Sequence, residues 1–253
     1  MITQKEQFER DGYLVVENLL SVDEVENYKK TYDKFLDGTV DCGAKRSDLG
    51  AGGAKKGKVE NITQIMWPSA LMPIMLDAPY HQRAAAIIQE LLGDDVELDF
   101  DMLIDKAPQS DTATPWHQDS AYWIDLPDRR AASIWLALDE ATLENGCMWY
   151  VPGSNDQSMR PHRPAGNAGG ALMCDGDEAE GVAVPLKPGS AVIHAGNTLH
   201  YARGNRTDNH RRAFILNFRP AAMIKLEREQ GMDHGLTDNT RKVRNETAKV
   251  EKV

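Results

Sequence analysis

The sequence predicts a mainly β protein, a jelly roll with N-terminal helices packed on one of its sheets, and three observations support this fold class. Helix signals, with capping residues and an apolar period of 3.6 residues, occur before residue 93. A run of about eight short strand-like segments with turn residues between them follows. Such a run is typical of layered antiparallel folds. We therefore expect one domain over residues 1–222, helical at about 1–93 and β at about 94–222, followed by a charged tail at 223–253.

The N-terminal part carries the helix signals. Ser21 and Glu24 form a capping box, in which a hydroxyl and a carboxylate each accept a backbone N–H of the first turn. The helix that they open is expected to run to about Leu36 and to end at Gly38. Its apolar face comprises Val22, Val25, Tyr28, Tyr32 and Leu36. The other elements expected here are a helix at 3–11, strands at 13–16 and 62–66, and a helix from Pro79 to Leu92.

Period-two alternation and short apolar runs predict the strands of the β part. They are expected at 96–104, 131–138, 147–151, 182–185, 191–194, 199–202 and 213–218. Two polar, Gly-rich segments, 41–58 and 155–181, are expected to be loops, either lids or solvated insertions. From Lys225 onward the chain is charged and almost without large apolar residues, so we expect a loosely docked or partly disordered tail.

Charge and cysteine content restrict the partners and the compartment. The net charge is −10, with acidic residues spread along the chain, which disfavours nucleic acid or an anionic membrane surface as the main partner. No apolar run of about 18 residues exists, and the charged N-terminus lacks the apolar core of a secretion signal. The three cysteines are odd in number and widely spaced, which indicates reduced thiols. We expect a cytoplasmic protein with a small-molecule substrate.

The segment Thr114–Trp123 contains the first candidate site, because His117 and Asp119 are separated by one residue. On an extended strand, residues i and i+2 point to the same face, so an imidazole and a carboxylate would converge. They would supply two of the three ligands of the 2-His-1-carboxylate set that holds non-haem Fe(II). A surface hydrogen-bonded pair is the alternative interpretation.

The third ligand would be a second histidine, and three candidates follow in the chain. His162 lies in a polar connection, whereas His194 and His200 lie in strand-rich sequence. Spacing alone does not distinguish His194 from His200.

Several ordered motifs resemble the phytanoyl-CoA dioxygenase family of Fe(II)- and 2-oxoglutarate-dependent oxygenases. They are His117-x-Asp119, Asn145-Gly-Cys, Val151-Pro-Gly-Ser154, Leu199-His200, Gly204-Asn205 and Arg211-Arg212, and the resemblance extends from about Phe8 to Pro220. It implies a double-stranded β-helix core, cupin-like in architecture, with Fe(II) as cofactor and 2-oxoglutarate and O₂ as cosubstrates. It also implies that His200 is the third iron ligand. Related halogenases have a small residue at the carboxylate position, so Asp119 argues for hydroxylation.

The same resemblance assigns cosubstrate contacts. Arg211 matches the arginine that binds the far carboxylate of 2-oxoglutarate, through two parallel hydrogen bonds. Strand alternation is compatible with Arg211, which would share a face with Ala213 and Ile215, while Arg212 would face the other way. Met102 and Trp135 match contact positions, with core packing as the alternative. A family lysine near the cosubstrate falls on Lys58, or on Lys55 or Lys56.

Two positions depart from the family pattern. Ala202 stands where a serine often hydrogen-bonds the cosubstrate, and its absence removes a hydrogen bond of order 1 kcal/mol. Asn155 stands where many relatives have His after Pro-Gly-Ser.

The expected activity is hydroxylation of an unactivated C–H bond of a small organic molecule, with succinate and CO₂ as co-products. Tyr122 and Trp123 are candidates for substrate contact, whereas core packing is preferred for Trp149. The alternatives are desaturation, ring formation or epimerisation at the same iron, a non-catalytic sensor that binds metal and 2-oxoglutarate, and a cupin-like hydrolase or isomerase that uses another metal ion.

Overall fold

The computed structural model describes residues 2–50, 60–166 and 171–237. Their helices are α1 (Gln4–Asp11), α2 (Val22–Leu36), α3 (Pro68–Leu71), α4 (Pro79–Leu92) and α5 (Ala221–Glu229), with 3₁₀ helices at η1 (Gly43–Lys45), η2 (Pro73–Asp77), η3 (Asp119–Tyr122), η4 (Ser154–Asp156) and η5 (Glu178–Glu180). Their strands are β1 (Tyr13–Val16), β2 (Arg46–Asp48), β3 (Ile62–Met66), β4 (Val96–Lys106), β5 (Thr114–His117), β6 (Ala132–Ala137), β7 (Met148–Tyr150), β8 (Arg163–Pro164), β9 (Leu172–Met173), β10 (Val182–Val184), β11 (Ala191–Ala195), β12 (His200–Ala202) and β13 (Arg211–Pro220). Among the described helices, none is long and apolar enough to cross a membrane.

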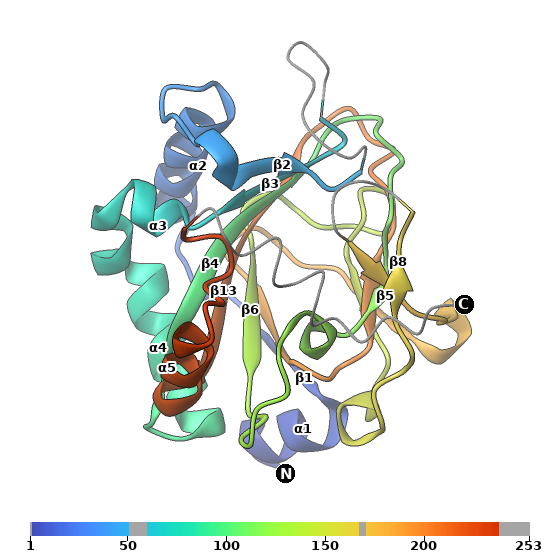
Figure 1. The fold of residues 1–253 in the computed structure, drawn as a ribbon. Coiled ribbons are helices and arrows are strands. Elements are labelled where there is room, and N and C mark those ends of the chain that lie inside the picture. The colour runs from blue at the N-terminus through green and yellow to red at the C-terminus, as the bar shows by residue number, and fades with distance from the viewer. Residues whose placement is uncertain (1, 51–59, 167–170, 238–253) are drawn as a thin grey trace.

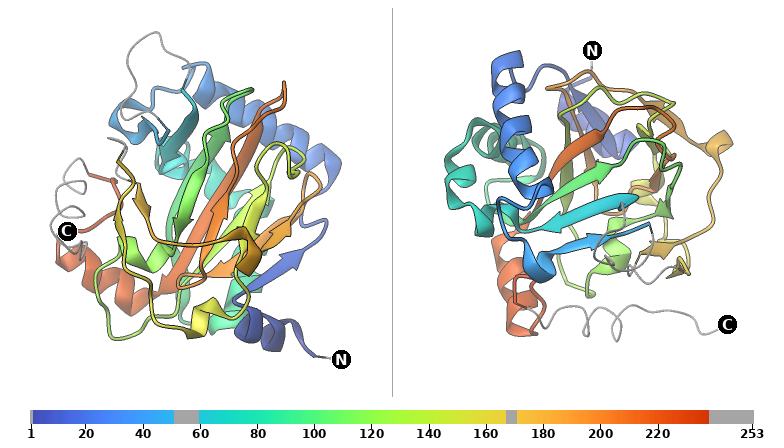
Figure 2. Two further views of the ribbon diagram at one scale, coloured as in Figure 1. Left: turned by 90° about the vertical axis from the view of Figure 1, so that its right-hand side faces the viewer. Right: turned by 90° about the horizontal axis from the view of Figure 1, so that it is seen from above.

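Two antiparallel sheets form the body of the protein. The large sheet has the order β1-β11-β6-β13-β4-β3-β2, and the second sheet has the order β10-β7-β12-β5. A small hairpin, β8-β9, lies in the segment that was expected to be a loop. Helices α2, α3 and α4 lie on one side of the large sheet and the second sheet on the other, and α2 passes behind the strands in the left view of Figure 2 (Figures 1 and 2). The predicted jelly roll with N-terminal helices on one sheet is confirmed.

The central strands of the large sheet are buried on both faces, which explains their continuous apolar sequence. One face packs against the helices through Ile134, Leu136, Ile193, Phe214 and Leu216. The alternate residues, Trp135, Ala137, Val192, Ala213 and Ile215, pack toward the second sheet. The period of two therefore sorts each strand between a helix-facing core and an inter-sheet core, and the inter-sheet side contains the candidate site.

Helix α2 has the predicted start and end. Ser21 and Glu24 form the capping box, and Gly38 has a φ of +84° just after the last helical turn. The predicted apolar face is wrong at one position, because Val22 is 79% exposed. Phe35, which is fully buried, completes the face instead. Val22 is the first helical residue and lies beyond the edge of the sheet-facing stripe.

The loop expected at 41–58 contains a strand, so that part of the prediction is wrong. Strand β2 pairs with β3 at the edge of the large sheet. Its Ser47 and Asp48 are polar yet buried, and the Asp48 carboxylate accepts the backbone N–H groups of Gly50, Asn61 and Ile62. Buried polar groups that are hydrogen-bonded give no apolar pattern, which is why the sequence does not reveal this strand. Residues 51–59 lie outside the described part of the chain.

The segment from Lys225 was expected to be loosely docked, and for residues 225–237 this is wrong. Glu227 and His234 are buried, and with Asp99, Arg219 and Arg228 they form an ion-pair network under α5. Burial alone would raise the pKa values of the Asp99 and Glu227 carboxyls, but the hydrogen bonds from His234 and the neighbouring cations hold them below their ordinary values. These charged side chains can be buried under α5 because each of them forms an ion pair or hydrogen bond with a neighbour of opposite charge. The division into a domain at 1–222 and a tail at 223–253 stays a prediction, and residues 238–253 lie outside the described part.

Candidate active site

The His-x-Asp motif lies where strand β5 ends. His117 is the last residue of β5, and Asp119 is the first residue of η3. Between them Gln118 is still extended, with φ −122° and ψ 129°, so the side chains two residues apart remain on one face. The convergence of side chains expected for a strand is therefore present, although strand β5 itself already ends at His117.

Gln118 anchors this segment on three sides. Its backbone N–H donates to His162 Nε2 at 3.0 Å, and its side-chain amide donates to the carbonyl of Asn197 at 2.8 Å and accepts the Arg160 N–H at 2.8 Å. His162 is therefore buried as a hydrogen-bond acceptor and does not join the His-x-Asp pair. Since Asn197 lies three residues before His200, the first residue of β12, these bonds also tie β5 to the strand that carries His200.

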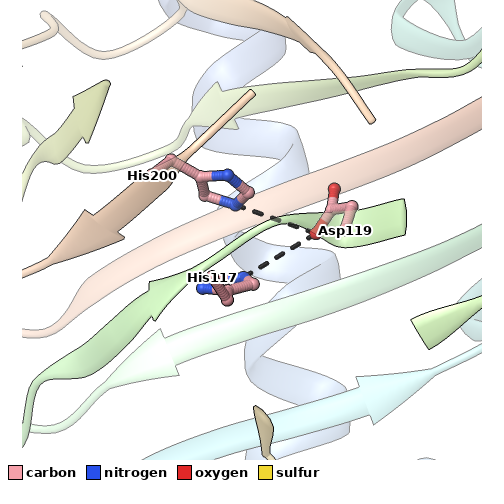
Figure 3. Close-up of side chains that lie close together, drawn as sticks. All are labelled: His117, Asp119 and His200. Atoms are coloured by element: carbon pink, nitrogen blue, oxygen red, sulfur yellow. Dashed lines mark ion pairs between the residues drawn. The ribbon is translucent and has the colours of Figure 1, made fainter. Parts of the chain in front are cut away.

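His200 lies directly opposite His117, because β12 pairs with β5 in that register. The Nε2 atoms of His117 and His200 each lie 3.7 Å from Asp119 Oδ1 (Figure 3). His117 Nδ1 lies 2.7 Å from the carbonyl oxygen of Pro115, and His200 Nδ1 lies 2.8 Å from that of Thr198. A carbonyl oxygen only accepts, so each Nδ1 carries the proton and each Nε2 lone pair points to the shared point.

The three donor groups have the charge states that a divalent metal requires. Burial lowers the pKa of His117, and burial together with the neighbouring rings lowers the pKa of His200 well below its ordinary value. Burial acts to raise the pKa of the Asp119 carboxyl, but the hydrogen bond from His194 and the nearby imidazoles hold it below its usual range. The site therefore presents two neutral imidazoles and one carboxylate, with ligand atoms within 4.8 Å of one another. This donor set fits the facial triad of a non-haem Fe(II) site.

His194 lies next to this cluster but bonds differently. Its Nε2 lies 3.2 Å from Asp119 Oδ2, and its Nδ1 lies 3.2 Å from the Tyr150 hydroxyl. Because a carboxylate oxygen accepts, Nε2 carries the proton in the neutral ring and Nδ1 accepts from Tyr150. Ser133 Oγ donates to the same Oδ2 at 2.8 Å. His194 and Ser133 thus hold one oxygen of Asp119, while the other faces His117 and His200.

Arg211 is a buried cation that faces the same cavity. It is 1% exposed, and its Nε and Nη1 have no hydrogen-bond partner among the described residues. Its guanidinium lies 5.1 Å from the centre of the Trp135 ring, and burial lowers its pKa to about 10. Arg212 points the other way, as strand alternation predicts, and pairs with Asp139 and Asp33.

One cavity connects these groups. It is lined by His117, Asp119, His200, Arg211, Met102, Trp135, Tyr122 and Trp123, so it brings together the described candidates for iron, cosubstrate and substrate contact. The Tyr122 hydroxyl accepts the backbone N–H of Leu172 at 2.8 Å. Lys58, like Lys55 and Lys56, lies outside the described residues.

The remaining candidates have packing roles. Trp149 is partly buried against two apolar clusters, with Arg203 over its ring at 5.0 Å, and it does not line the cavity. Ala202 is buried in the inter-sheet core. The Asn155 side chain donates to the carbonyl of Glu9 and so ties helix α1 to the segment after β7.

Sequence reasoning missed the residues that support Asp119. Ser133 Oγ also accepts from the Asn217 amide at 3.0 Å, so a chain of hydrogen bonds leads from β13 to the carboxylate. Ser133 is the one polar residue of the apolar strand β6. An isolated hydroxyl in a strand that is buried on both faces needs a hydrogen-bond partner, and that requirement is the signal that could have revealed it.

Comparisons with known proteins identify the family of the chain. Residues 8–213 match the family model described as phytanoyl-CoA dioxygenase (PhyH). Phytanoyl-CoA dioxygenase domain-containing protein 1 of Bos taurus is 27% identical over 262 residues, which cover 87% of this chain and 90% of the relative. Ectoine dioxygenase of Sphingopyxis alaskensis is 26% identical over 248 residues, which cover 91% and 79%.

A solved structure shows the same fold with the cosubstrate bound. EvdO2 from Micromonospora carbonacea var. aurantiaca, complexed with 2-oxoglutarate, is 34% identical, with a TM-score of 0.72 over 86% of this chain and 90% of that chain. The double-stranded β-helix that the motifs implied is therefore confirmed. The chain belongs to the phytanoyl-CoA dioxygenase family, and it is a 2-oxoglutarate-dependent oxygenase that uses Fe(II), 2-oxoglutarate and O₂.

Proposed function

We propose that His117, Asp119 and His200 bind the Fe(II) ion of a hydroxylase. The observation that carries this proposal is the convergence of two Nε2 atoms and one carboxylate oxygen in the cavity that also contains the unpaired Arg211. Three protein ligands on one face of an iron ion leave positions for a keto acid and for O₂. His194 is not a ligand in this proposal, because its Nε2 proton is directed at Asp119 Oδ2.

Arg211 is the proposed partner of the far carboxylate of 2-oxoglutarate. A buried guanidinium with two unpaired nitrogens is costly, and a carboxylate that accepts two parallel hydrogen bonds would remove that cost. Ile215 lies on the same face of β13 as Arg211, four positions further along the strand. Met102 on β4 and Trp135 on β6 are its cross-strand neighbours on either side. They are proposed to pack against the methylene carbons of the cosubstrate. A contact from Lys58 stays a prediction.

The residues around the metal position have distinct proposed roles. Iron with 2-oxoglutarate and O₂ supplies the oxidising chemistry, which gives succinate and CO₂ and converts a substrate C–H to C–OH. Ser133 and His194 orient Asp119 so that Oδ1 faces the metal position. Tyr122 and Trp123, on the cavity wall, are the proposed substrate contacts. The apolar remainder of the lining limits water near the reacting atoms.

The test uses anaerobically purified protein loaded with Fe(II) and 2-oxoglutarate. Isotopically labelled O₂ is admitted in the presence of a substrate panel, and succinate and products are quantified. Hydroxylation predicts one labelled oxygen atom in the product for each succinate formed. A product that has lost two hydrogens and gained no oxygen would contradict hydroxylation while leaving the oxygenase assignment intact.

We also infer a reducing compartment, the cytoplasm. Cys42, Cys147 and Cys174 are buried and unbridged, and burial raises the pKa of the Cys174 thiol to about 11. Cysteines without a disulfide among them are typical of proteins from reducing compartments. Quantification of thiols in denatured protein from fresh extract should give all three cysteines in the free form, and a disulfide would contradict the inference.

A further inference from the structure

The wall of the cavity that runs along β3 has a composition that restricts the substrate. We call it the β3 wall: Gln64 and Met66 on β3, Phe100 on β4, Trp123 after η3, and Leu172 on β9. Strand β4 separates β3 from β13, which carries Arg211. Phe100 pairs with Asn217, which lies six positions, about 20 Å of extended chain, from Arg211. Gln64 lies closer, because it pairs with Ile104, which pairs with Ala213, two positions from Arg211.

Charged side chains are scarce in the described lining. Apart from the three histidines, the charged side chains of the described lining are Asp119 and Arg211. The proposed function assigns Asp119 to iron and Arg211 to 2-oxoglutarate. The other polar side chains of the described lining are Gln64, Thr114, Tyr122 and Ser133, and none of them carries a charge. A carboxylate, phosphate or ammonium of a substrate would therefore find no free counter-charge among the described lining residues, and burial of an unpaired charge costs several kcal/mol.

Two aromatic rings of the β3 wall, those of Trp123 and Phe100, pack against residues outside the cavity lining. The Arg219 guanidinium lies 5.1 Å from the centre of the Trp123 ring, and the His234 ring lies 4.3 Å from that of Phe100. Arg219 and His234 belong to the buried ion-pair network under α5. A β-carbon at Gly196 would lie 2.5 Å from the Trp123 ring, so the backbone at Gly196 also packs closely against this ring. The wall is therefore a preorganised apolar surface.

Gln64 is the polar group of this wall. Its amide donates to the sulfur of Met102 at 3.4 Å. A thioether is a weak acceptor, so a hydroxyl or carbonyl oxygen of a ligand would replace it at little cost.

We propose that the β3 wall binds the part of the substrate that reaches the iron, and that this part is uncharged, mainly apolar, and hydrogen-bonded to Gln64. This inference rests on the proposed function, because that function assigns Asp119 and Arg211 to iron and 2-oxoglutarate. Any ionised group of the substrate then lies outside the described cavity, and zwitterionic or short anionic substrates are disfavoured.

The test compares ligands of one shape and different charge. Phenylpropanamide, phenylpropanoate and phenylpropylammonium are titrated anaerobically into the protein loaded with Fe(II) and 2-oxoglutarate, and binding is followed by the perturbation of the visible iron–2-oxoglutarate band. The amide should bind at least about tenfold more tightly than either ion. Equal or tighter binding of the carboxylate or the ammonium would overturn the proposal, as would binding of none of the three to protein that shows the band.

Two variants locate the effect. Gln64→Leu should weaken the amide by about three- to tenfold, the loss of one neutral hydrogen bond, without changing the band formed with 2-oxoglutarate. Thr114→Lys, on the half-buried β5 side of the cavity, should shift the preference toward the carboxylate. An affinity for the amide that is unchanged in Gln64→Leu would contradict the assignment of the β3 wall. Absence of the band before any ligand is added would instead count against the proposed function.

Discussion

Replacement of Arg211 by Met should weaken 2-oxoglutarate binding and leave the ligand-free protein as stable as before or more stable. In the ligand-free protein, Arg211 Nε and Nη1 have no partner among the described residues, and the guanidinium contacts the Trp135 ring. Methionine keeps an apolar contact with that ring and removes the buried charge. The two effects have opposite signs because the charge is useful only when a carboxylate is bound.

The magnitude follows from the burial of Arg211. Burial lowers the pKa of its guanidinium from 12.5 to about 10, which corresponds to about 3 kcal/mol of destabilisation of the charged form at neutral pH. The cation–π contact that is lost offsets about 0.5–2 kcal/mol of this. The free energy of unfolding should therefore rise by about 1–2 kcal/mol. Loss of two hydrogen bonds to a carboxylate, each worth about 1.5–3 kcal/mol, should raise the Kd for 2-oxoglutarate at least about 100-fold.

Two measurements and one matched control test this reasoning. Urea denaturation of metal-free protein gives the stability, and anaerobic titration of the visible band with 2-oxoglutarate gives the affinity. Arg212→Met is the control, because Arg212 lies on the opposite face and pairs with Asp139 and Asp33. It should lower stability and leave the affinity for 2-oxoglutarate unchanged. Wild-type affinity in Arg211→Met, or a loss of stability as large as that of the control, would refute the account.

Three further predictions concern the supports of the site. Ser133→Ala removes a hydrogen bond to Asp119 Oδ2 and should weaken Fe(II) binding about 10- to 100-fold in an anaerobic metal titration. Arg219→Met leaves the buried carboxylates of Asp99 and Glu227 short of a partner and should lower the free energy of unfolding by about 3–5 kcal/mol in urea. Because the pKa values of these two carboxyls lie below their ordinary values of 3.8 and 4.5, their stabilising contribution is complete above about pH 4.5 and is lost as the pH falls further. Melting temperatures measured from pH 7 to pH 3 should show that loss.

Controls for these predictions come from the same chain. Arg129 pairs with Asp125 on the exposed surface, so Arg129→Ala should change the free energy of unfolding by less than about 1 kcal/mol. A similar small change in Arg219→Met would show that the network under α5 is not a stabilising element. Wild-type iron affinity in Ser133→Ala would show that the orientation of Asp119 does not depend on the hydroxyl. Equal acid sensitivity of Arg219→Met and the wild type would contradict the assignment of the pH dependence to Asp99 and Glu227.

Elements with a strong apolar period could be predicted from the sequence because their pattern reflects what they pack against. Strand β6 is apolar except for Ser133 since both of its faces are buried, and α2 is amphipathic since one face packs on the sheet. Strand β2 and the segment 225–237 could not be predicted in this way. Their buried residues are polar or charged and are satisfied by partners distant in sequence, such as Asp99 for Arg228.

The site was only partly accessible to the same reasoning. The spacing of His117 and Asp119 indicates a converging pair by itself, since it depends on local backbone geometry. The choice between His194 and His200 depends on strand pairing and on the direction of a proton, which spacing does not contain. Both histidines lie close to Asp119, and only the register of β12 against β5 puts His200 opposite His117.

The most direct test of the central claim is anaerobic titration of the protein with Fe(II) in the presence of 2-oxoglutarate, followed by the visible charge-transfer band, in the wild type and in His200→Ala and His194→Ala. We expect one equivalent of iron to produce the band in the wild type, no band in His200→Ala, and a band formed with weaker iron affinity in His194→Ala. A band that is kept in His200→Ala and lost in His194→Ala would contradict the assignment of His117, Asp119 and His200 as the iron ligands.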